Sequence, residues 1–394
     1  MSDGAARWRP PADGDWRADA KRKQHEALPA GPTVVSSTGP YGNGGLGQHL
    51  ADLVEGLRQD GHLADYLTPA PKPQDPDALG IAVRPRAGKL LRARLVRASL
   101  SPGWRILTNN VAFDHAGARL LPADAEHLLV FNGHALRHLA TARRLGYQSV
   151  GLVSANAHLA YEAREFARAY RRYPIERPWA ARNVPRNLSE YAAADYIHVS
   201  SRYVWESFVR EGVPEERLRL FPLTPNERFR PREHPPTATT FNVVYVGSLL
   251  VHKGTPLLID AVRRLPHDDL RLVLVGGWGT RAMRRHIEAA KHADPRIVVA
   301  PGDPLPHLLQ AGVAVHPSYG EGCAYAPGEA VACGVPLIAS SNTGMNEAIS
   351  GPVERHVVPT DDIDALALAI DAAYGGAWPP MPERPAAAQL TRPA

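Results

Sequence analysis

Short apolar runs alternate with longer amphipathic stretches along most of the chain, and the alternation is clearest after residue 240. The runs there read VVYVGS, RLVLVGG, RIVVA, VAVHPS, VPLIAS and HVVP, with helical stretches between them. Apolar runs without a polar alternation are typical of parallel strands that are buried on both faces. This half of the chain is therefore predicted to form an α/β domain with a six-stranded parallel sheet.

The first half shows the same alternation less clearly. Strands are predicted where apolar runs end in turn residues, and helices where the period is close to 3.6 residues. The predicted strands cover 33–38, 64–68, 103–108, 127–132, 149–156, 196–200 and 218–223. The predicted helices include 46–58, 188–194 and one that ends at Glu211. Both halves are thus predicted to be Rossmann-like.

Breaks in the pattern set the expected domain limits. Residues 222–240 contain five prolines and no period, which is typical of a linker. A chain of 394 residues is also long for one core. We expect a disordered tail over 1–30, an N-terminal domain over 31–225, a linker over 226–240 and a C-terminal domain over 241–375. Residues 376–394 are expected to form a tail that can pack back on the first domain.

Composition narrows the functional classes. The formal charge is +5 and the pI is near 9.2, which favours an anionic partner, but the patterns of nucleic-acid modules are absent. No apolar run is long enough to cross a bilayer, and Cys323 and Cys333 are the only cysteines, so a cytoplasmic protein is expected. Residues 89–100 form a basic amphipathic stretch, either a surface helix or a peripheral contact with the inner face of a membrane.

Three segments combine glycine with chemistry-bearing side chains. A helix that begins near Tyr325 would offer free backbone N–H groups to a phosphate, with Glu321 before it and Glu329 inside it. Lys253 follows the strand VVYVGS, where an ammonium can neutralise a diphosphate. Residues 39–45 form a glycine loop between a strand and a helix, which is typical of a phosphate cradle. Solvated surface glutamates and ordinary tight turns are the alternatives.

The stretch EGCAYAPGEAVACGVP resembles the Glu-x7-Glu signature of the retaining family 4 glycosyltransferases, which have the GT-B fold. The resemblance implies two Rossmann-like domains that face an interdomain cleft. It implies that Glu329 binds the nucleotide ribose, that Glu321 lies against the donor sugar and that Lys253 faces the diphosphate. It also implies that His158 supports the transition state, with His134 as the competing histidine.

The remaining implied roles are assigned by position. The implied donor-binding residues are Gly44, Gly45, Gly47, Ser248, Lys253, Glu321, Gly322, Cys323, Ala324, Tyr325, Glu329, Thr343 and Gly344. Ser248 stands where arginine is frequent in the family, and Arg164 or another arginine of the first domain is the expected compensation. Asn156, Arg164 and Arg168 are the expected acceptor-binding residues.

The sequence therefore predicts a retaining glycosyltransferase that moves a sugar from a nucleotide-diphosphate sugar to a hydroxyl of a glycan, a lipid-linked acceptor or a small molecule. His158, Lys253 and Glu321 are the predicted catalytic residues. No metal ligand, cofactor or nucleic-acid partner is expected, and the oligomeric state is left open. The alternatives are another GT-B enzyme, such as an epimerase or a phosphorylase, and a non-catalytic nucleotide-sugar-binding subunit.

Overall fold

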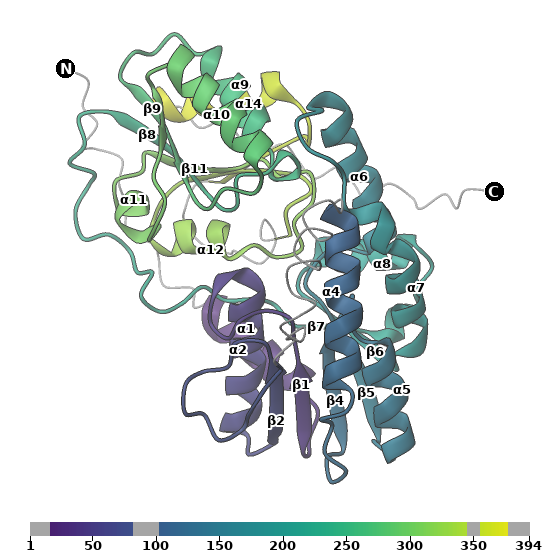
Figure 1. The fold of residues 1–394 in the computed structure, drawn as a ribbon. Helices are drawn as coiled ribbons and strands as arrows, with labels where there is room; N and C mark the ends of the chain where they lie inside the picture. The colour runs from purple at the N-terminus through teal and green to yellow at the C-terminus, as the bar shows by residue number, and fades with distance from the viewer. Residues whose placement is uncertain (1–15, 82–101, 345–354, 377–394) are drawn as a thin grey trace.

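The computed structural model describes residues 16–81, 102–344 and 355–376, and it shows two α/β lobes, each built on one parallel sheet (Figure 1). The predicted fold class of two Rossmann-like domains is confirmed. Residues 221–240 join the sheets without a helix or strand of their own. The predicted basic helix over 89–100 and the predicted C-terminal tail beyond residue 376 lie outside the described residues.

The sheet of the first lobe has seven strands in the order β3-β2-β1-β4-β5-β6-β7. Its strands are β1 (Thr33–Ser36), β2 (Leu63–Thr68), β3 (Ala78–Gly80), β4 (His127–Phe131), β5 (Ser149–Ser154), β6 (Tyr196–Val199) and β7 (Leu218–Leu220). Its helices include α2 (Gly44–Gln59), α4 (Pro102–Gly117), α5 (Leu136–Leu145), α6 (Leu159–Arg172), α7 (Val184–Ala193) and α8 (Arg202–Arg210), with short 3₁₀ turns at Ala180–Asn183 and Glu215–Arg217. All pairings are parallel, as in a doubly wound sheet.

The strand predicted over 103–108 is wrong, because these residues lie in helix α4. The run WRIL is short, and periodicity alone does not separate a short strand from a helix segment. Pro102 occupies the first position of the helix, where its fixed φ is tolerated. The buried positions Gly103, Phe113 and Gly117 set the face that packs inward, and they lie too far apart to form an apolar run.

The expected tail over 1–30 is also wrong in part, because Trp16–Ala27 forms helix α1. This helix has few apolar residues, and it docks through polar contacts that have no periodic signature. The Arg17 guanidinium donates to the carbonyl of Phe229 over 2.6 Å, and the Gln24 amide donates to the carbonyl of Pro222 over 2.6 Å. Helix α1 therefore lies against the linker between the lobes.

The sheet of the second lobe has six strands in the order β10-β9-β8-β11-β12-β13, so the predicted six-stranded parallel sheet is confirmed. Its strands are β8 (Phe241–Val246), β9 (Leu270–Val275), β10 (Ile297–Val299), β11 (Val313–His316), β12 (Leu337–Ser340) and β13 (Arg355–Val358). Its helices are α9 (Thr255–Arg263), α10 (Arg281–Ala293), α11 (Leu305–Leu309), α12 (Tyr325–Ala332) and α14 (Ile363–Tyr374), with a 3₁₀ turn at Val251–Lys253.

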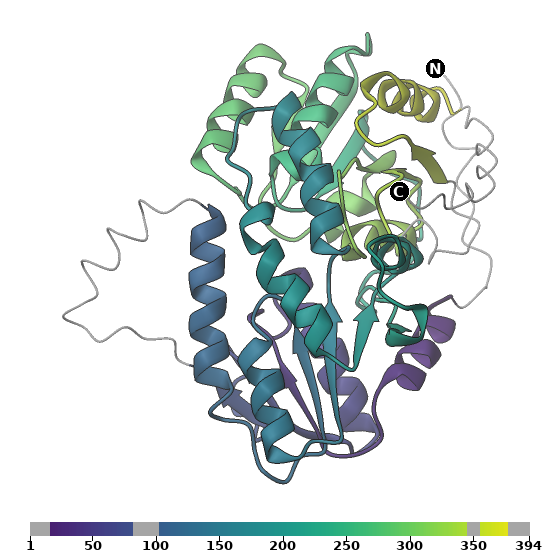
Figure 2. The ribbon, with the colours of Figure 1, turned by 90° about the vertical axis from the view of Figure 1, so that its right-hand side faces the viewer.

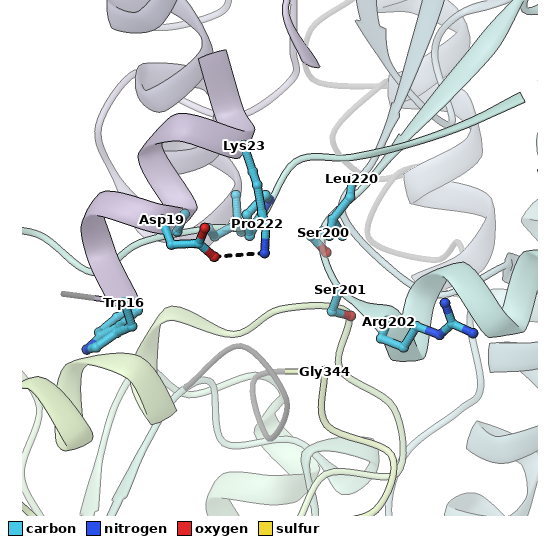
Figure 3. A pocket seen from close by; sticks show the side chains of 11 residues that line it. Trp16, Asp19, Lys23, Ser200, Ser201, Arg202, Leu220, Pro222 and Gly344 are labelled. Carbon is cyan, nitrogen blue, oxygen red and sulfur yellow. Dashed lines mark ion pairs between the residues drawn. The ribbon is translucent and has the colours of Figure 1, made fainter. Parts of the chain in front are cut away.

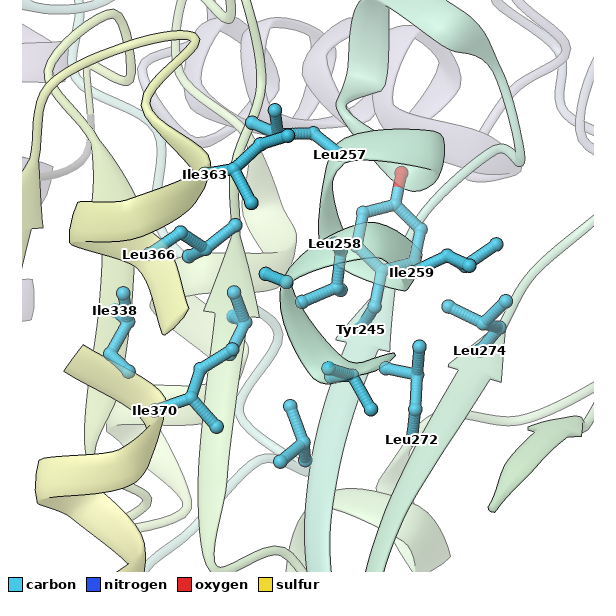
Figure 4. Close-up of a cluster of buried hydrophobic side chains, with 14 of the residues drawn as sticks. Tyr245, Leu257, Leu258, Ile259, Leu272, Leu274, Ile338, Ile363, Leu366 and Ile370 are labelled. Atoms are coloured by element: carbon cyan, nitrogen blue, oxygen red, sulfur yellow. The ribbon is translucent and has the colours of Figure 1, made fainter. Parts of the chain in front are cut away.

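Buried aliphatic side chains join α9 and α14 to one face of this sheet. Leu258 of α9 and Ile370 of α14 pack with Leu272, Leu274 and Ile338 of the strands (Figure 4). Full burial of one such side chain stabilises the fold by about 1.5–3 kcal/mol. Continuous apolar strands are possible here because helices cover both faces of the sheet.

Helix α6 belongs to the first lobe by sequence, but it extends along the second lobe in both views (Figure 1, Figure 2). Phe166 and Tyr170 are buried in the same cluster as Val251 and Leu257 of the second lobe. The Tyr170 hydroxyl lies 3.0 Å from Nδ1 of His252. This contact fixes how the lobes face each other and brings α6 to the loop that carries Lys253.

Candidate active site

The predicted site residues of the second lobe follow two adjacent strands of its sheet. Strand order reverses between β8 and β11, which pair directly. Lys253 follows β8 and Glu321 follows β11, so both lie at the carboxyl ends of strands at a topological switch point. Open α/β sheets bind their ligands in the crevice at such a point.

A glycine holds the lysine loop against the neighbouring loop. Gly254 has a φ of +75°, and a Cβ atom on it would lie 2.0 Å from the carbonyl oxygen of Pro317. The backbone N–H of Tyr319 donates to the carbonyl of His252 over 2.9 Å. The two loops are thus joined backbone to backbone, and any other residue at 254 would separate them.

Lys253 and Glu321 form an ion pair in this crevice, and Nε2 of His316 lies 3.7 Å from Oε2 of Glu321. Burial raises the pKa of the Glu321 carboxyl, but the charge of Lys253 and the contact with His316 outweigh that effect. The net result is a pKa well below the usual range, so Glu321 is ionised at neutral pH. The crevice therefore holds a fixed negative charge beside a lysine ammonium.

The Glu321 loop is fixed on both sides by backbone contacts. The backbone N–H of Glu321 donates to the carbonyl of Asn342 over 2.9 Å, and the carbonyl of Glu321 accepts from the N–H of Gly344 over 3.0 Å. Thr343 completes the bridge between the two loops. The first lobe closes from the other side, because a Cβ atom on Gly322 would lie 2.4 Å from the carbonyl oxygen of Ala155.

Helix α12 begins at Tyr325, with Ala324 as its N-cap residue, and the predicted start is confirmed. No side chain caps it with a hydrogen bond, so its first N–H groups are left for other acceptors. Gly45 of the glycine loop faces Tyr325, since a Cβ atom there would lie 3.9 Å from the tyrosine ring. The Tyr325 hydroxyl donates to Asp52 of α2 over 2.6 Å and joins the lobes.

Glu329 lies on the same helix, one turn beyond Tyr325. Burial raises the pKa of its carboxyl to about 7, against a smaller opposing effect of Arg228, while Asp303 raises the pKa further. Its charge therefore changes near neutral pH. A carboxylate there could accept hydrogen bonds from two neighbouring hydroxyls.

The glycine loop of the first lobe leads into helix α2, where Gly47 is required for close packing. A Cβ atom on Gly47 would lie 1.8 Å from the carbonyl oxygen of Pro40, whereas one on Gly44 would meet no atom within 4 Å. Helix α2 begins at Gly44, and its N-cap residue Asn43 makes no side-chain cap. The loop therefore presents the open N-terminus of α2 near that of α12.

The described contacts of His158 are with residues of the first lobe. It is the N-cap residue of α6, and its ring packs against Tyr191 and Phe208 at centroid distances of 4.8 and 5.0 Å. Burial lowers its pKa to about 4, and no described residue pairs with its Nδ1. His134 is also buried, with its Nε2 3.4 Å from the carbonyl of Ser36.

The predicted acceptor residues fall into two groups. Asn156 lies in the loop that meets Gly322, at the cleft. The Arg164 guanidinium instead pairs with Glu211. Arg168 pairs with Glu165 over 2.9 Å and approaches Asp361 of the second lobe at 3.9 Å. Neither arginine is paired with the residues around Lys253.

Ser248 and Cys323, two predicted donor-binding residues, bring no charge to the site. Ser248 is exposed, and its carbonyl accepts from the Tyr245 hydroxyl over 2.9 Å. Cys323 is buried, and burial raises the pKa of its thiol to about 12, so the thiol is neutral at physiological pH. Cys323 therefore adds packing rather than charge beside the start of α12.

A cavity of about 160 Å³ lies beside the ion pair rather than at it. Trp16 and Lys23 of α1 line one side, and Ser200, Ser201 and Gly344 line the other (Figure 3). Lys23 is paired with Asp19 over 2.7 Å. The cavity shares a wall with the Glu321 loop, because Oγ of Ser201 donates to the carbonyl of Gly322 over 2.6 Å. Lys253 and Glu321 do not line it, so it marks the edge of the site.

Sequence reasoning missed Glu162, a buried carboxyl of α6 that interacts electrostatically with Lys253 and Glu321. The sequence does contain a signal for a buried acid here, because Glu162 is an acidic residue in the first turn of an otherwise apolar helix face. It also missed Glu176, which accepts from the backbone N–H of Val251 over 2.8 Å and from the Thr280 hydroxyl over 2.5 Å. Each contact crosses from one lobe to the other.

No helix in the described ranges combines the length and apolarity needed to cross a bilayer. Within the same ranges, no group of three or more histidine, cysteine, aspartate or glutamate side chains is arranged to hold a metal ion.

Comparison with known proteins points to one family. Residues 226–386 match the family model described as "Glycosyl transferases group 1". The putative colanic acid biosynthesis glycosyltransferase WcaL of Escherichia coli is 29% identical over 177 residues, which is 41% of this chain and 43% of WcaL. A D-inositol 3-phosphate glycosyltransferase of Xylanimonas cellulosilytica is 28% identical over 202 residues, which is 45% of this chain and 48% of the relative. The match spans less than half the length of these two relatives.

Solved structures extend the likeness in fold to both lobes. A sucrose-phosphate synthase from Thermosynechococcus elongatus has a TM-score of 0.65 at 22% identity, covering 88% of this chain and 90% of that one. HepE from Anabaena, in complex with UDP-glucose, has a TM-score of 0.59 at 15% identity, with 88% and 90% covered. The chain therefore shares the two-lobe fold of these structures, and the sequence match to the family model begins in the linker and covers the second lobe.

Proposed function

We propose that this chain is a retaining glycosyltransferase that transfers a sugar from a nucleotide-diphosphate sugar to a hydroxyl acceptor without a metal ion. The observation that carries the proposal is the meeting of Lys253 and Glu321 at the switch point of the second sheet. The match of residues 226–386 to the glycosyl transferase family model supports the reaction class. The complex of HepE with UDP-glucose supports a nucleotide sugar as the donor.

In this proposal the positive groups act on the leaving diphosphate. Transfer breaks the bond between the anomeric carbon and the β-phosphate oxygen, and negative charge grows on that oxygen. The Lys253 ammonium and the uncapped N–H groups at the start of α12 would stabilise this charge. The acceptor hydroxyl attacks from the same face, and its proton passes to a phosphate oxygen of the departing group.

The two glutamates would hold the two ends of the donor. Glu329, one turn inside α12, would accept hydrogen bonds from the ribose hydroxyls. Glu321 is ionised and half-buried beside Lys253, where it would hold a hydroxyl of the transferred sugar. The acceptor would enter from the first lobe, where the loop at Asn156 faces Gly322. His158 is proposed to act from beneath this loop.

The first experiment identifies the donor. UDP-, GDP-, ADP- and dTDP-sugars are screened by thermal shift, and the strongest ligand is then incubated with an acceptor panel after exhaustive treatment with EDTA. Proton NMR of the product shows whether the anomeric configuration is kept. An inverted product, or turnover that returns only with added metal, would overturn the retaining, metal-independent form of the proposal.

Two rival functions, a non-catalytic binding subunit and an epimerase, need their own controls. A non-catalytic subunit would bind a nucleotide sugar and turn over no acceptor, and an epimerase would change the donor in the absence of acceptor. Following the donor alone by NMR separates the epimerase from the transferase. A thermal shift with UDP-glucose and no product over the whole panel would favour the binding subunit.

A further inference from the structure

Glu162 is a buried carboxyl of the first lobe that lies next to the loop carrying Glu321. It lies in the first turn of α6 and is 1% exposed. A Cβ atom on Gly320 would lie 3.4 Å from Cγ and 3.6 Å from Oε1 of Glu162, so its carboxyl is packed against the residue that precedes Glu321. The same Cβ atom would lie 3.1 Å from the ring of Phe166, so glycine at 320 lets α6 pack closely here.

Two other glutamates, the buried Glu190 and the half-buried Glu176, have clear structural partners, and Glu162 differs from them. Glu190 accepts from the backbone N–H of Ala135 over 2.8 Å and pairs with Arg186 over 2.9 Å. Glu176 accepts from Val251 and Thr280. Oε2 of Glu162 has no hydrogen-bond partner among the described residues. A buried oxygen without a partner costs stability, so a fold gains nothing by keeping it for packing alone.

Its surroundings favour the neutral acid. Burial raises the pKa of Glu162 to about 8, and the Glu321 charge adds to this, against opposing effects of Lys253 and Asn156. Tyr191 and Tyr203 also interact electrostatically with Glu162. Burial raises the pKa of both tyrosines, and the pKa of Glu321 is lowered. None of these three groups therefore changes its charge near pH 8.

We propose that Glu162 is a sugar-binding residue that hydrogen-bonds a hydroxyl of the donor sugar and makes the site select neutral, hydroxylated sugars over uronic acids. This inference rests on the proposed glycosyltransferase function. A protonated carboxyl can both donate and accept, as a hydroxyl does. Oε2 is enclosed in this structure and has no partner among the described residues, so a sugar hydroxyl that displaced the residues around it would satisfy it.

The selection against uronic acids follows from the charges of the cleft. A sugar carboxylate placed beside Glu321 would meet an ionised group, while Lys253 is already paired with that glutamate. A second carboxyl at Glu162 offers it no cation either. Like charges in a buried site repel strongly, whereas sugar hydroxyls find acceptors and a donor there.

The test compares Glu162→Gln, which keeps a neutral hydrogen-bonding group, with Glu162→Ala, which keeps none. Glu206→Gln is the matched control, because Glu206 is an exposed carboxylate on α8 that pairs with Arg202. Each protein is assayed with a UDP-hexose and with the matching UDP-uronate over pH 6–9.5. Binding of UDP itself is measured by calorimetry.

We expect Glu162→Gln to keep kcat/KM for the UDP-hexose within about threefold of wild type at pH 7, and Glu162→Ala to raise the donor KM about 10- to 100-fold, the range of one lost buried hydrogen bond. UDP affinity stays unchanged in both variants. Wild type loses activity as the pH rises through about 8, where Glu162 ionises, and Glu162→Gln does not. The uronate is a poor donor for every protein.

Two results would overturn the inference. If Glu162→Gln is as impaired as Glu162→Ala at pH 7, the ionised carboxylate is the active form; if Glu162→Ala keeps the wild-type donor KM, Glu162 does not touch the sugar. A fall in melting temperature with an unchanged donor KM indicates a purely structural role. If wild-type protein binds no nucleotide sugar, the proposed glycosyltransferase function is itself overturned. This result differs from the two above, so a failure of the function can be told from a failure of the Glu162 inference.

Discussion

The Lys253 ammonium donates to the Glu321 carboxylate across the ends of two adjacent strands, although the residues are 68 positions apart in the sequence. The pair holds Glu321 in its ionised form and leaves the crevice with balanced charge. A ligand that brings a diphosphate would take over the lysine, and Glu321 would then be free to turn to a hydroxyl. The pair therefore connects donor binding with the state of the proposed reaction centre.

Lys253→Ala is predicted to lower kcat by about 10²–10³-fold, the usual cost of removing one group that stabilises a developing oxyanion. Single-turnover kinetics with the identified nucleotide sugar measure this directly. Lys291→Ala is the control, because Lys291 pairs with Glu288 on the exposed side of α10. Unchanged turnover in Lys253→Ala would remove the lysine from the mechanism.

Glu329 is predicted to make nucleotide binding stronger as the pH rises from 6 to 8. Burial raises its pKa to about 7, and the ionised form is the better acceptor for ribose hydroxyls. Calorimetric titration with the free nucleotide should show this slope in wild type. Glu329→Gln should bind about tenfold more weakly at pH 8 and lose the slope.

The raised pKa of Glu329 makes the fold less stable as the pH rises, whereas it makes nucleotide binding stronger. Folded Glu329 holds a proton that the unfolded chain releases above its ordinary pKa, so its contribution to the unfolding free energy falls as the pH rises from about 4.5 to 7. Glu329→Gln should therefore melt higher than wild type at pH 8 and at the same temperature at pH 4. A melting difference that is independent of pH would contradict this assignment.

Gly47→Ala is predicted to destabilise the first lobe, and Gly45→Ala is predicted to leave its stability nearly unchanged. A Cβ atom at 47 would lie 1.8 Å from the carbonyl oxygen of Pro40, while one at 45 would make only an ordinary contact at 3.9 Å. The cost at 47 should be about 1–3 kcal/mol, as for other overpacked positions. Chemical denaturation of the two variants gives the comparison, and equal midpoints would show that the loop can shift freely.

Tyr325→Phe is predicted to lower the unfolding free energy by about 1–3 kcal/mol, because it leaves the buried Asp52 carboxyl with one fewer donor between the lobes. Tyr374→Phe is the control, because that hydroxyl donates to Asp269 over 2.7 Å at an exposed position within the second lobe. Small-angle scattering should show a more open pair of lobes only in Tyr325→Phe. Identical scattering curves would mean that α6 alone sets the closure.

The amino-acid sequence by itself determined the repeating elements of the second lobe. Its six strands are continuous apolar runs, and its signature helix begins at Tyr325 as predicted, because these features depend on neighbours in sequence. The positions of Lys253, Glu321 and Glu329 relative to strand and helix ends followed from the same local rules. The predicted strand over 103–108 failed where those rules are ambiguous, in a short apolar run that lies in α4.

Only the tertiary structure decided which side chains are covered by the other lobe. Helix α1 has no clear period and is held through contacts with residues about 200 positions away. The sequence shows Glu162 only as an acidic residue on an apolar helix face, and it becomes a neutral acid because α6 lies on the second lobe beside Lys253 and Glu321. Desolvation and charge depend on everything within a few ångströms, whatever its position in the chain, and no local pattern records that.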